Sequence, residues 1–184
     1  MSRSDFRIAP FTDADARELA TLHMQVWRDT YVGMLSQDYL DGMQLEPRVA
    51  HWRRRIGVGS ARESEAGGVV DGVLFRSRLA RHVPSGRLAG FCQIGGARDD
   101  DAPVPQELGA LNVLRDFHGS GVARQLVDET LGERAAYLWV VRENLRAQAF
   151  YRKLGFAADG GSKRDDELQC DEIRMVRSVP IPRH

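Results

Sequence analysis

The chain has 184 residues, and its 26 Lys and Arg residues balance 26 Asp and Glu residues, so its formal net charge is zero. A neutral balance gives no reason to expect nucleic acid or a membrane surface as the main partner, and the length suits one domain, 1–184. The two cysteines lack metal-ligand spacing and a disulfide framework, and no apolar run approaches 18 residues, so we expect no metal site and a soluble, unexported, cytoplasmic protein.

The first third of the chain predicts one strand followed by helices. Phe6 to Pro10 is the strand candidate, and Thr12 to Asp15 is a capping box that opens a helix. That helix has an apolar face made by Leu19, Leu22, Val26 and Thr30. Beside it runs a stripe that either packs or lines a pocket, made by His23, Trp27 and Tyr31.

Two more helices and a loop are expected next. One helix starts near Ser36 and another near Pro47, the second with a buried side of Val49, Trp52 and Ile56. We interpret Arg53 to Arg55 as a solvated helix face. The Gly-, Glu- and Ser-rich stretch from Ser60 to Gly72 predicts a mobile loop.

The middle of the chain predicts a hairpin. Its strands are Val73 to Arg81 and Leu88 to Gly96, joined by turn residues Pro84 to Gly86. Arg98 to Pro105 follows as a polar loop whose three aspartates are either solvated or form an acidic rim that attracts a cationic amine.

A glycine-bearing turn stands between a strand and a helix in the next segment. The strand is Glu107 to Leu114, the turn is His118-Gly-Ser-Gly-Val-Ala123, and the helical pattern continues through Leu126, Val127, Thr130 and Leu131. Two glycines let the backbone approach an anion closely, and the helix dipole and free N–H groups favour a pyrophosphate there. The Gly-Lys-Ser/Thr ending of a P-loop is absent, and Arg124 stands where a dinucleotide fingerprint needs Gly or Ala. A plain strand-to-helix turn is the remaining alternative.

The last part of the chain predicts a strand, a helix and a final strand. Tyr137 to Val141 is the strand, and Gly155 ends the following helix in the left-handed conformation favoured at helix C-termini. Gly160 to Glu167 is expected to be a loop, Glu172 to Arg177 the final strand, and Pro180 to His184 a frayed tail.

His118 to Ala123 resembles the pyrophosphate-binding signature of the GNAT superfamily of N-acetyltransferases: Arg or Gln, two residues, Gly, any residue, then Gly or Ala. Gly121 and Ala123 match this signature, while His118 replaces the usual Arg or Gln. Downstream, Leu138 to Phe156 resembles the superfamily's strand, Asn, Tyr seven residues later and closing Gly-Phe. The early patterns Trp27-Arg-x-x-Tyr-x-Gly33 and His51-Trp-Arg53 look like those of small bacterial members.

The resemblance implies an α/β (α+β) GNAT fold, with a central, twisted, mixed but mostly antiparallel sheet and helices on both faces. Its fourth and fifth strands run parallel and splay apart, and here they are Glu107–Leu114 and Tyr137–Val141. The acyl-pantetheine arm of acetyl-CoA (coenzyme A) lies in such an opening, which makes 107–156 the acyl-CoA-binding core. The expected cofactor contacts are Leu111, Asn112, Val113, His118, Gly119, Ser120, Gly121, Val122, Ala123, Arg124, Asn144 and Phe150.

The implied function is acetyl-CoA-dependent N-acetylation of a primary amine, in a small molecule or a peptide, by direct transfer in a ternary complex. Tyr151 is the candidate acid for the departing thiolate, and a strand N–H near Val113 is the candidate donor to the oxyanion. Glu107 is the candidate base, with His23 or a water chain as alternatives. Trp139 occupies the position of a second glutamate that some members use, so that route is absent.

A non-catalytic acyl-CoA-binding regulatory module is the alternative function. The replacement at His118 and the unsettled base favour it, whereas Tyr151 and Asn144 favour an enzyme. The expected partner is the amine acceptor, with no nucleic acid and no membrane, and a homodimer is left open.

Overall fold

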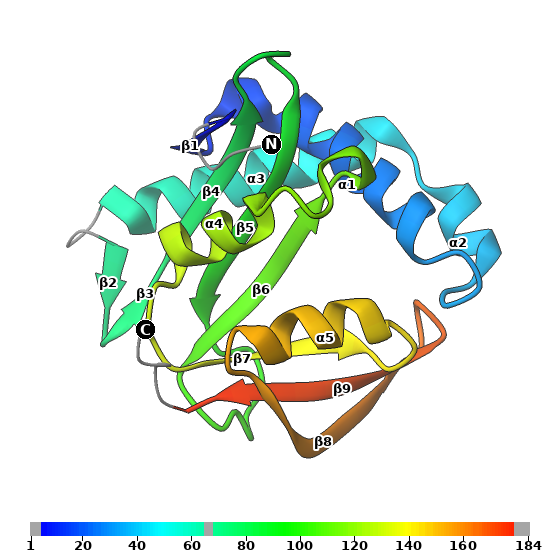
Figure 1. Cartoon of the computed structure of the whole chain (residues 1–184), viewed down its shortest axis with the longest axis vertical. Helices are drawn as coiled ribbons and strands as arrows, with labels where there is room; N and C mark the ends of the chain where they lie inside the picture. Colours follow the sequence, from blue (N-terminus) through cyan, green and yellow to red (C-terminus); the bar gives the residue numbers. More distant parts are fainter. Residues whose placement is uncertain (1–4, 65–67, 179–184) are drawn as a thin grey trace.

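The computed structural model describes residues 5–64 and 68–178, and its centre is a seven-stranded sheet in the order β1-β4-β5-β6-β7-β9-β8 (Figure 1). The strands are β1 (Phe6–Pro10), β4 (Arg76–His82), β5 (Leu88–Gly96), β6 (Gln106–Val113), β7 (Ala136–Val141), β8 (Ala157–Asp165) and β9 (Cys170–Arg177). All neighbours in this sheet are antiparallel except β6 and β7, which are parallel. A separate ribbon pairs β2 (Val69–Val70) with β3 (Val73–Leu74).

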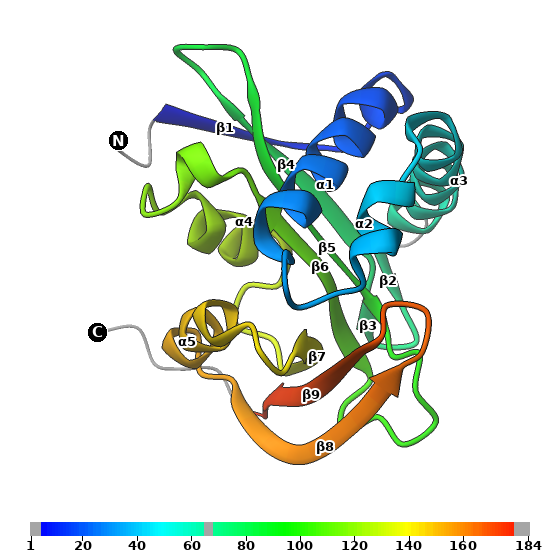
Figure 2. The same cartoon turned by 90° about the vertical axis from the view of Figure 1, so that its right-hand side faces the viewer.

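Helices cover both faces of the sheet, as Figure 2 shows. One side carries α1 (Ala16–Thr30), α2 (Gln37–Gly42) and α3 (Leu45–Ser64), and the other carries α4 (Val122–Thr130) and α5 (Leu145–Lys153). Two short 3-10 turns, Asp13–Asp15 and Arg115–Phe117, precede α1 and α4. The expected mixed, mostly antiparallel sheet between helical layers is therefore confirmed. Within the described ranges, none of the helices combines the length and the apolar character needed to cross a bilayer.

The first helix is positioned by its start and by its apolar face. The Asp15 carboxylate accepts hydrogen bonds from the Thr12 backbone N–H at 2.9 Å and from the Thr12 hydroxyl at 2.6 Å, which fixes the chain entering the helix. The predicted buried face of α1 and that of α3 pack on the sheet. Trp52 of α3 meets Phe91 of β5 edge to face, with ring centroids 4.9 Å apart.

The two parallel strands separate soon after they meet. Glu107 of β6 pairs with Tyr137 of β7, and no second pair joins these strands within the described residues. By contrast, β5 pairs with β6 along nearly its whole length, with a register shift between Gln93 and Ile94, close to Gly109. The opening expected between Glu107–Leu114 and Tyr137–Val141 is present.

A second hydrophobic core ties the two halves of the sheet together beyond this opening. It contains Met24, Leu35, Leu40, Met43, Val141 and Cys170. These side chains come from α1, from α2 and its flanking segments, and from the C-terminal strands. The Ser36 N–H also donates to the Leu168 carbonyl at 3.3 Å, so the segment after α1 reaches across to the turn before β9.

Three predicted boundaries were wrong. Ser60 to Ser64 belong to α3 rather than to a loop, because Ala, Arg and Glu are good helix formers and extend the helix past its glycines. Gly160 to Asp165 belong to β8, where a register shift between Ala158 and Ser162 accommodates the glycines. The strand expected from Val73 to Arg81 is interrupted at Phe75. Residues 65–67 of the predicted loop and the predicted tail Pro180 to His184 lie outside the described residues.

Candidate active site

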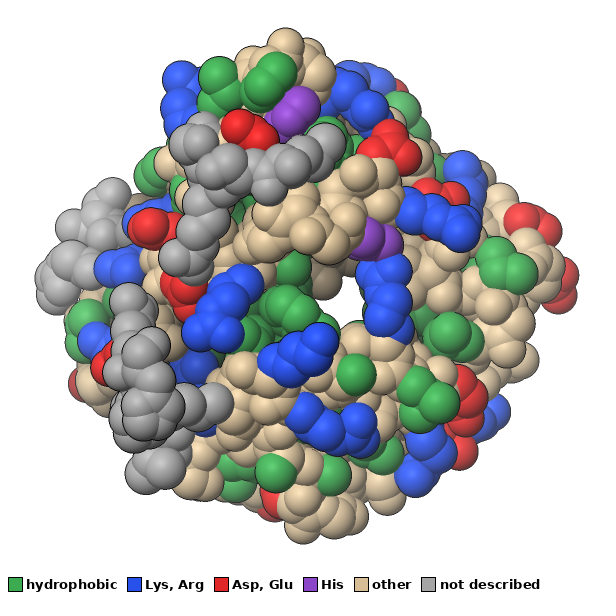
Figure 3. Space-filling model, in the orientation of Figure 1, with side chains coloured by type: hydrophobic (Ala, Val, Ile, Leu, Met, Phe, Trp, Pro, Cys, Tyr) green, Lys and Arg blue, Asp and Glu red, His purple; other side chains and the backbone are tan. Residues whose placement is uncertain are grey.

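The space between β6 and β7 is a cavity of about 720 Å³, here called the acyl cleft. Its walls come from β6, β7, α1, the start of α4 and α5. Figure 3 shows the molecule hollowed at this point, with Lys or Arg and His side chains at the rim. Of the twelve expected cofactor contacts, all but Ser120 and Val122 line the cleft.

The glycine turn lies at one end of the acyl cleft and starts α4. Gly119 and Gly121 have φ angles of 78° and 86°, values that side chains disfavour, and a Cβ added at either would meet no atom within 4 Å. The Gln125 N–H bonds to the Gly121 carbonyl at 3.0 Å and the Val122 N–H donates to the Ser120 hydroxyl at 3.4 Å, which leaves the N–H groups of Ala123 and Arg124 without partners inside the helix. Open space beside bare glycines and free N–H groups fits a pyrophosphate.

His118 is held as a neutral ring by two neighbours. Its Nε2 lies 3.0 Å from the Val113 carbonyl oxygen, while Arg146 Nη1 lies 2.6 Å from Nδ1 and Arg146 Nη2 lies 2.9 Å from Nε2, so the ring lies between a carbonyl acceptor and a guanidinium donor. Burial first, and then Arg146 and Arg115, lower the pKa of His118 against the raising effect of the Val113 bond. Arg146, from the first turn of α5, lines the cleft and brings to this end the cation that His118 does not supply. Sequence reasoning missed Arg146.

One wall of the cleft is the edge of β6 that faces β7. The Leu114 N–H donates to the Ala89 carbonyl at 2.9 Å, on the β5 side. Because successive peptide groups in a strand point to opposite sides, the N–H groups of Val113 and Leu111 point into the cleft. The opposite wall includes Asn144, whose Oδ1 accepts from the Ala147 N–H at 3.1 Å and caps α5.

Tyr151 lines the acyl cleft and is buried, with 8% of its surface exposed. Its ring packs edge to face against Phe150 and Phe156. Burial first, and then Tyr31 and Cys92, raise the pKa of Tyr151 well above its usual value. The phenol therefore keeps its proton at neutral pH.

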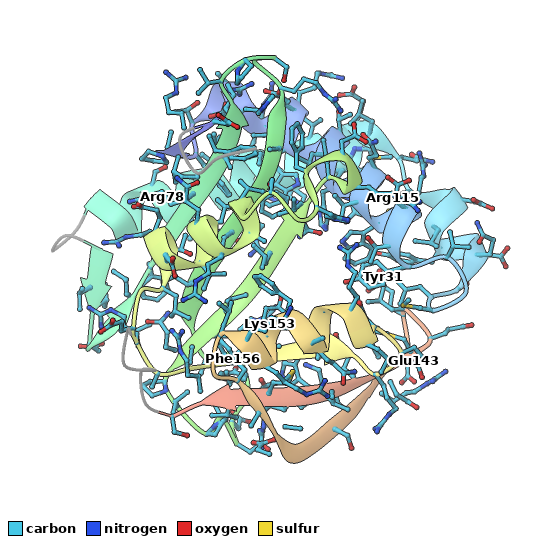
Figure 4. The ribbon with its side chains drawn as sticks, viewed as in Figure 1. Tyr31, Arg78, Arg115, Glu143, Lys153 and Phe156 are labelled. Carbon is cyan, nitrogen blue, oxygen red and sulfur yellow. The ribbon has the colours of Figure 1, made fainter. Side chains whose placement is uncertain are left out.

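Tyr31 and Glu172 lie where α1 approaches α5 and β9. Tyr31 sits between the end of α1 and the start of α5 (Figure 4), and both side chains line the cleft. Burial, and then Glu172, raise the pKa of Tyr31 to about 12. Burial also raises the pKa of Glu172, although Lys163 lies 3.7 Å away. These two residues were not predicted as site residues.

His23 of α1, the alternative candidate base, lines the acyl cleft. Its ring meets Trp27, Trp52 and Phe91 edge to face, and its Nδ1 is buried without a hydrogen-bond partner among the described residues. Burial first, followed by Arg48, lowers the pKa of His23 to about 3. The ring is neutral at pH 7. The stripe of His23, Trp27 and Tyr31 thus both packs and lines the cleft.

Glu107, the candidate base, lines a second cavity of about 410 Å³, here called the side cavity. Its buried carboxylate is held by the Arg98 guanidinium, with Nε 2.9 Å from Oε2 and Nη2 close to Oε1. The side cavity shares His51, Arg55 and Gly109 with the acyl cleft, so the two spaces meet at the β6 residue near the register shift. Other charged side chains of the side cavity are Arg54 and Arg76.

Two expectations about charged residues need correction. Arg53 and Arg54 are exposed, as a solvated helix face predicts, but Arg55 is half-buried, and both Arg54 and Arg55 line the side cavity. Asp99 is not a free rim carboxylate, because Tyr137 Oη and Trp139 Nε1 each donate to its Oδ2 at 2.8 Å. Burial raises the pKa of Asp99, but these bonds and Lys163 outweigh it and hold the pKa below its usual value.

Cys92 offers no nucleophile. The thiol is fully buried under the sheet, and burial raises its pKa to about 12, so it stays protonated at neutral pH. A route through a covalent acyl-cysteine at Cys92 is therefore disfavoured.

Comparisons with known proteins agree with this geometry. Residues 77–158 match the family model described as Acetyltransferase (GNAT) domain. An uncharacterised N-acetyltransferase of Mycobacterium tuberculosis is 38% identical over 87 residues, which are 44% of this chain and 52% of that protein, so the match spans about half of the relative's length.

Solved structures show the same fold at low identity. PaiA N-acetyltransferase from Thermoplasma acidophilum, solved in complex with coenzyme A, has a TM-score of 0.65 and 18% identity and covers 92% of this chain and 97% of its own. The ribosomal-protein-S5-alanine acetyltransferase from Vibrio fischeri has a TM-score of 0.68 and 11% identity over 97% of this chain and 96% of its own. Residues 77–158 are therefore similar to the GNAT family of N-acetyltransferases, and the whole chain has the fold of these solved acetyltransferases.

Proposed function

We propose that this protein transfers an acetyl group from acetyl-CoA directly to a primary amine. The observation that carries the proposal is one continuous opening between β6 and β7, which runs from the bare glycines at α4 to Tyr151 and meets a second cavity at Gly109. The acyl cleft suits an extended cofactor arm, and the side cavity suits an acceptor. The GNAT family uses acetyl-CoA, which supports the choice of donor.

Several parts of the chain would hold the cofactor. The N–H groups at the start of α4 and the Arg146 guanidinium would bind the pyrophosphate, while the Val113 and Leu111 edge would pair with the amide groups of the pantetheine arm. Asn144 and Phe150 would contact the arm from the α5 side. On this proposal, residues 1–184 work as one domain around the core 107–156.

Acyl transfer makes three demands on the protein: a donor for the oxyanion, an acid for the departing thiolate and a base for the acceptor ammonium. Acetyl-CoA supplies the acetyl group and departs as a thiol. An N–H donor must stabilise the thioester oxygen as it becomes an oxyanion, an effect worth about 3 kcal/mol, and the inward-pointing Val113 N–H is the proposed donor. Tyr151 then gives its proton to the sulfur as the C–S bond breaks. Because burial raises the pKa of Tyr151, the phenol keeps its proton until the thiolate forms beside it.

Glu107 is the proposed base that takes the proton from the acceptor ammonium. Among the described residues that line the side cavity, it is the single carboxylate. Its oxygens are engaged by Arg98, so the proton would reach it through a water molecule or after that ion pair opens. His23 is the alternative acceptor of the proton and a weaker one, because burial lowers its pKa to about 3.

Replacing Tyr151 by Phe tests the acid. We expect the rate of thiol release with a confirmed amine to fall about 10²-fold or more, because general-acid catalysis is lost, while the affinity for coenzyme A by calorimetry changes little. Tyr39→Phe is the matched control: Tyr39 packs against Trp27 outside the cleft and should keep wild-type turnover. Equal rates for both variants would remove Tyr151 from the mechanism.

The base is tested by Glu107→Gln across a pH series. Loss of a base should hurt most at low pH and be partly rescued at high pH, where the amine loses its proton unaided, whereas Tyr151→Phe should hurt most at high pH. If the pH–rate profile of Glu107→Gln falls at low pH in the same way as that of the wild type, another group is the base.

The alternative, a non-catalytic acyl-CoA-binding regulator, rests on the replacement at His118. It predicts tight acetyl-CoA binding with no thiol release for any amine or peptide N-terminus tested. Turnover with one acceptor would exclude it.

A further inference from the structure

The side cavity contains more positive charge than its carboxylate can balance. Four arginines line it, namely Arg54, Arg55, Arg76 and Arg98, against the single carboxylate of Glu107 among the described lining residues. Arg98 already occupies that carboxylate. Arg54 and Arg55 form no ion pair with any residue that the structure describes, and the hydrogen bond that Arg76 makes there goes to a neutral group, the Glu129 carbonyl oxygen at 3.3 Å.

Arg55 is the most costly of these charges to leave unmatched. It is half-buried, and its Nη2 donates to the amide oxygen of Gln93, which is neutral. Burial first, and then the repulsion of Arg98, lower the pKa of Arg55. A cation in such a place favours an anion that can approach it.

The same helix brings a histidine and two arginines to the meeting point of the two cavities. His51, Arg54 and Arg55 stand at positions i, i+3 and i+4 of α3, so they share one face of the helix. Burial, followed by Arg55, Arg48 and Arg54, lowers the pKa of His51, so its ring is neutral at pH 7. The pKa of His51 is therefore sensitive to the positive charge of the arginines, while its neutral ring does nothing to balance that charge.

We propose that the acceptor amine carries an acidic group, a carboxylate or a phosphate, which Arg54 and Arg55 bind in the side cavity. The proposal rests on the acetyl transfer proposed above and names the class of its substrate. Arginine presents a planar fork that matches both anions, and bonds between two charged groups are about twice as strong as neutral ones. A cavity of about 410 Å³ lies in the range that small molecules fill. The acceptor's ammonium would face Glu107 and its acid would face α3.

Matched acceptors test the proposal by turnover. The pairs O-phosphoethanolamine and ethanolamine, and 4-aminobutyrate and butylamine, differ in the acid, and the two pairs separate phosphate from carboxylate. We expect kcat/KM for at least one acidic member to exceed that of its partner without the acid by about tenfold or more, since a bond to a charged group contributes that much. Arg54→Ala should remove most of this preference, and Arg55→Lys should reduce it.

Arg53→Ala is the control, because Arg53 belongs to the same arginine run but points away from the cavity, 4.0 Å from Asp13. It should keep the preference. The proposal is overturned if the members that lack the acid are acetylated with the same kcat/KM as the acidic ones, or if Arg53→Ala and Arg54→Ala behave alike.

A binding readout separates this proposal from acetyl transfer itself. The NMR pKa of His51 should rise when O-phosphoethanolamine or 4-aminobutyrate is added to the wild-type protein and to Arg53→Ala, because the anion offsets the arginines, but not in Arg54→Ala. If no amine is ever acetylated yet this rise is seen, the acid site stands and the transfer proposal fails. If amines without an acid are acetylated and the pKa of His51 does not rise, the acid site fails and the transfer proposal stands.

Discussion

At the scale of single residues, Gly121 sets how closely an anion can approach α4. Its φ of 86° places it in the left-handed region, and the space where a Cβ would project is empty. Any side chain there enters the space proposed for the pyrophosphate. A negative side chain adds repulsion to the steric conflict.

Gly121→Asp should therefore abolish coenzyme A binding, measured by calorimetry on a variant that still unfolds cooperatively. Gly121→Asn is the matched control, since Asn has nearly the same shape, tolerates the left-handed conformation and carries no charge. We expect Asn to weaken binding and Asp to weaken it at least tenfold more. Wild-type affinity in both variants would place the pyrophosphate elsewhere.

The residues that could be predicted from the sequence are those in local motifs. Gly121, Asn144 and Tyr151 stand at fixed spacings in one continuous stretch, so the sequence places them in a turn, a cap and a helix. Arg146 could not be recognised, because its contact with His118 joins residues 28 positions apart. Arg54 and Arg55 looked like a solvated run, since nothing local shows that β5 and β6 pass beneath that face of α3.

At the scale of elements, the edges of β6 and β7 act as the walls of a site. A strand normally gives its N–H groups to a neighbour, but β6 does so only toward β5 beyond Glu107. The free groups on the other side are preorganised for an extended ligand. Backbone pairing of this kind gives affinity without requiring particular side chains.

Hydrogen exchange tests this arrangement one amide at a time. We expect the N–H groups of Leu111 and Val113 to exchange several-fold more slowly once coenzyme A is bound, because each gains an acceptor. The N–H of Leu114, already bonded to Ala89, is the internal control and should change little. Equal slowing of all three would indicate general stabilisation rather than strand-like pairing.

Element positions were predictable where the apolar period was strong. The strands Phe6–Pro10 and Leu88–Gly96 have the predicted limits, since their ends coincide with Pro or Gly residues. The strand β8 was not predictable, because Gly160 and Gly161 have low strand propensity and are held there by pairing with β9. Tertiary pairing decided that segment against its local preference.

At the scale of the whole molecule, the acyl cleft divides the sheet into two parts. The parts are joined by the Glu107–Tyr137 pair, by the second hydrophobic core and by the main core, which contains Leu138 and Met175 as well as Leu108. A cofactor in the cleft would contact both parts at once. Its binding energy would therefore add to the stability of the fold as a whole.

Calorimetric melting checks this coupling. With coenzyme A at about 100 times its Kd, the folded state gains about 2.7 kcal/mol, which for a chain of this size raises Tm by about 5–10 °C. Gly121→Asp should show no such rise. A cofactor that binds tightly to the wild type without moving Tm would contradict a site shared by both parts.

The separation of β6 from β7 also affects how readily the protein associates with other chains. Most sheets carry their unpaired edges at the rim, where charges, bulges or short strands keep other chains away. Here a pair of unpaired edges faces inward, and the backbone of any extended peptide offers the same amide groups as a pantetheine arm. An empty cleft would thus offer a strand from another molecule the same backbone groups that it offers to a cofactor. Bound coenzyme A would occupy these strand edges, so it would reduce self-association of the protein in addition to serving in the reaction.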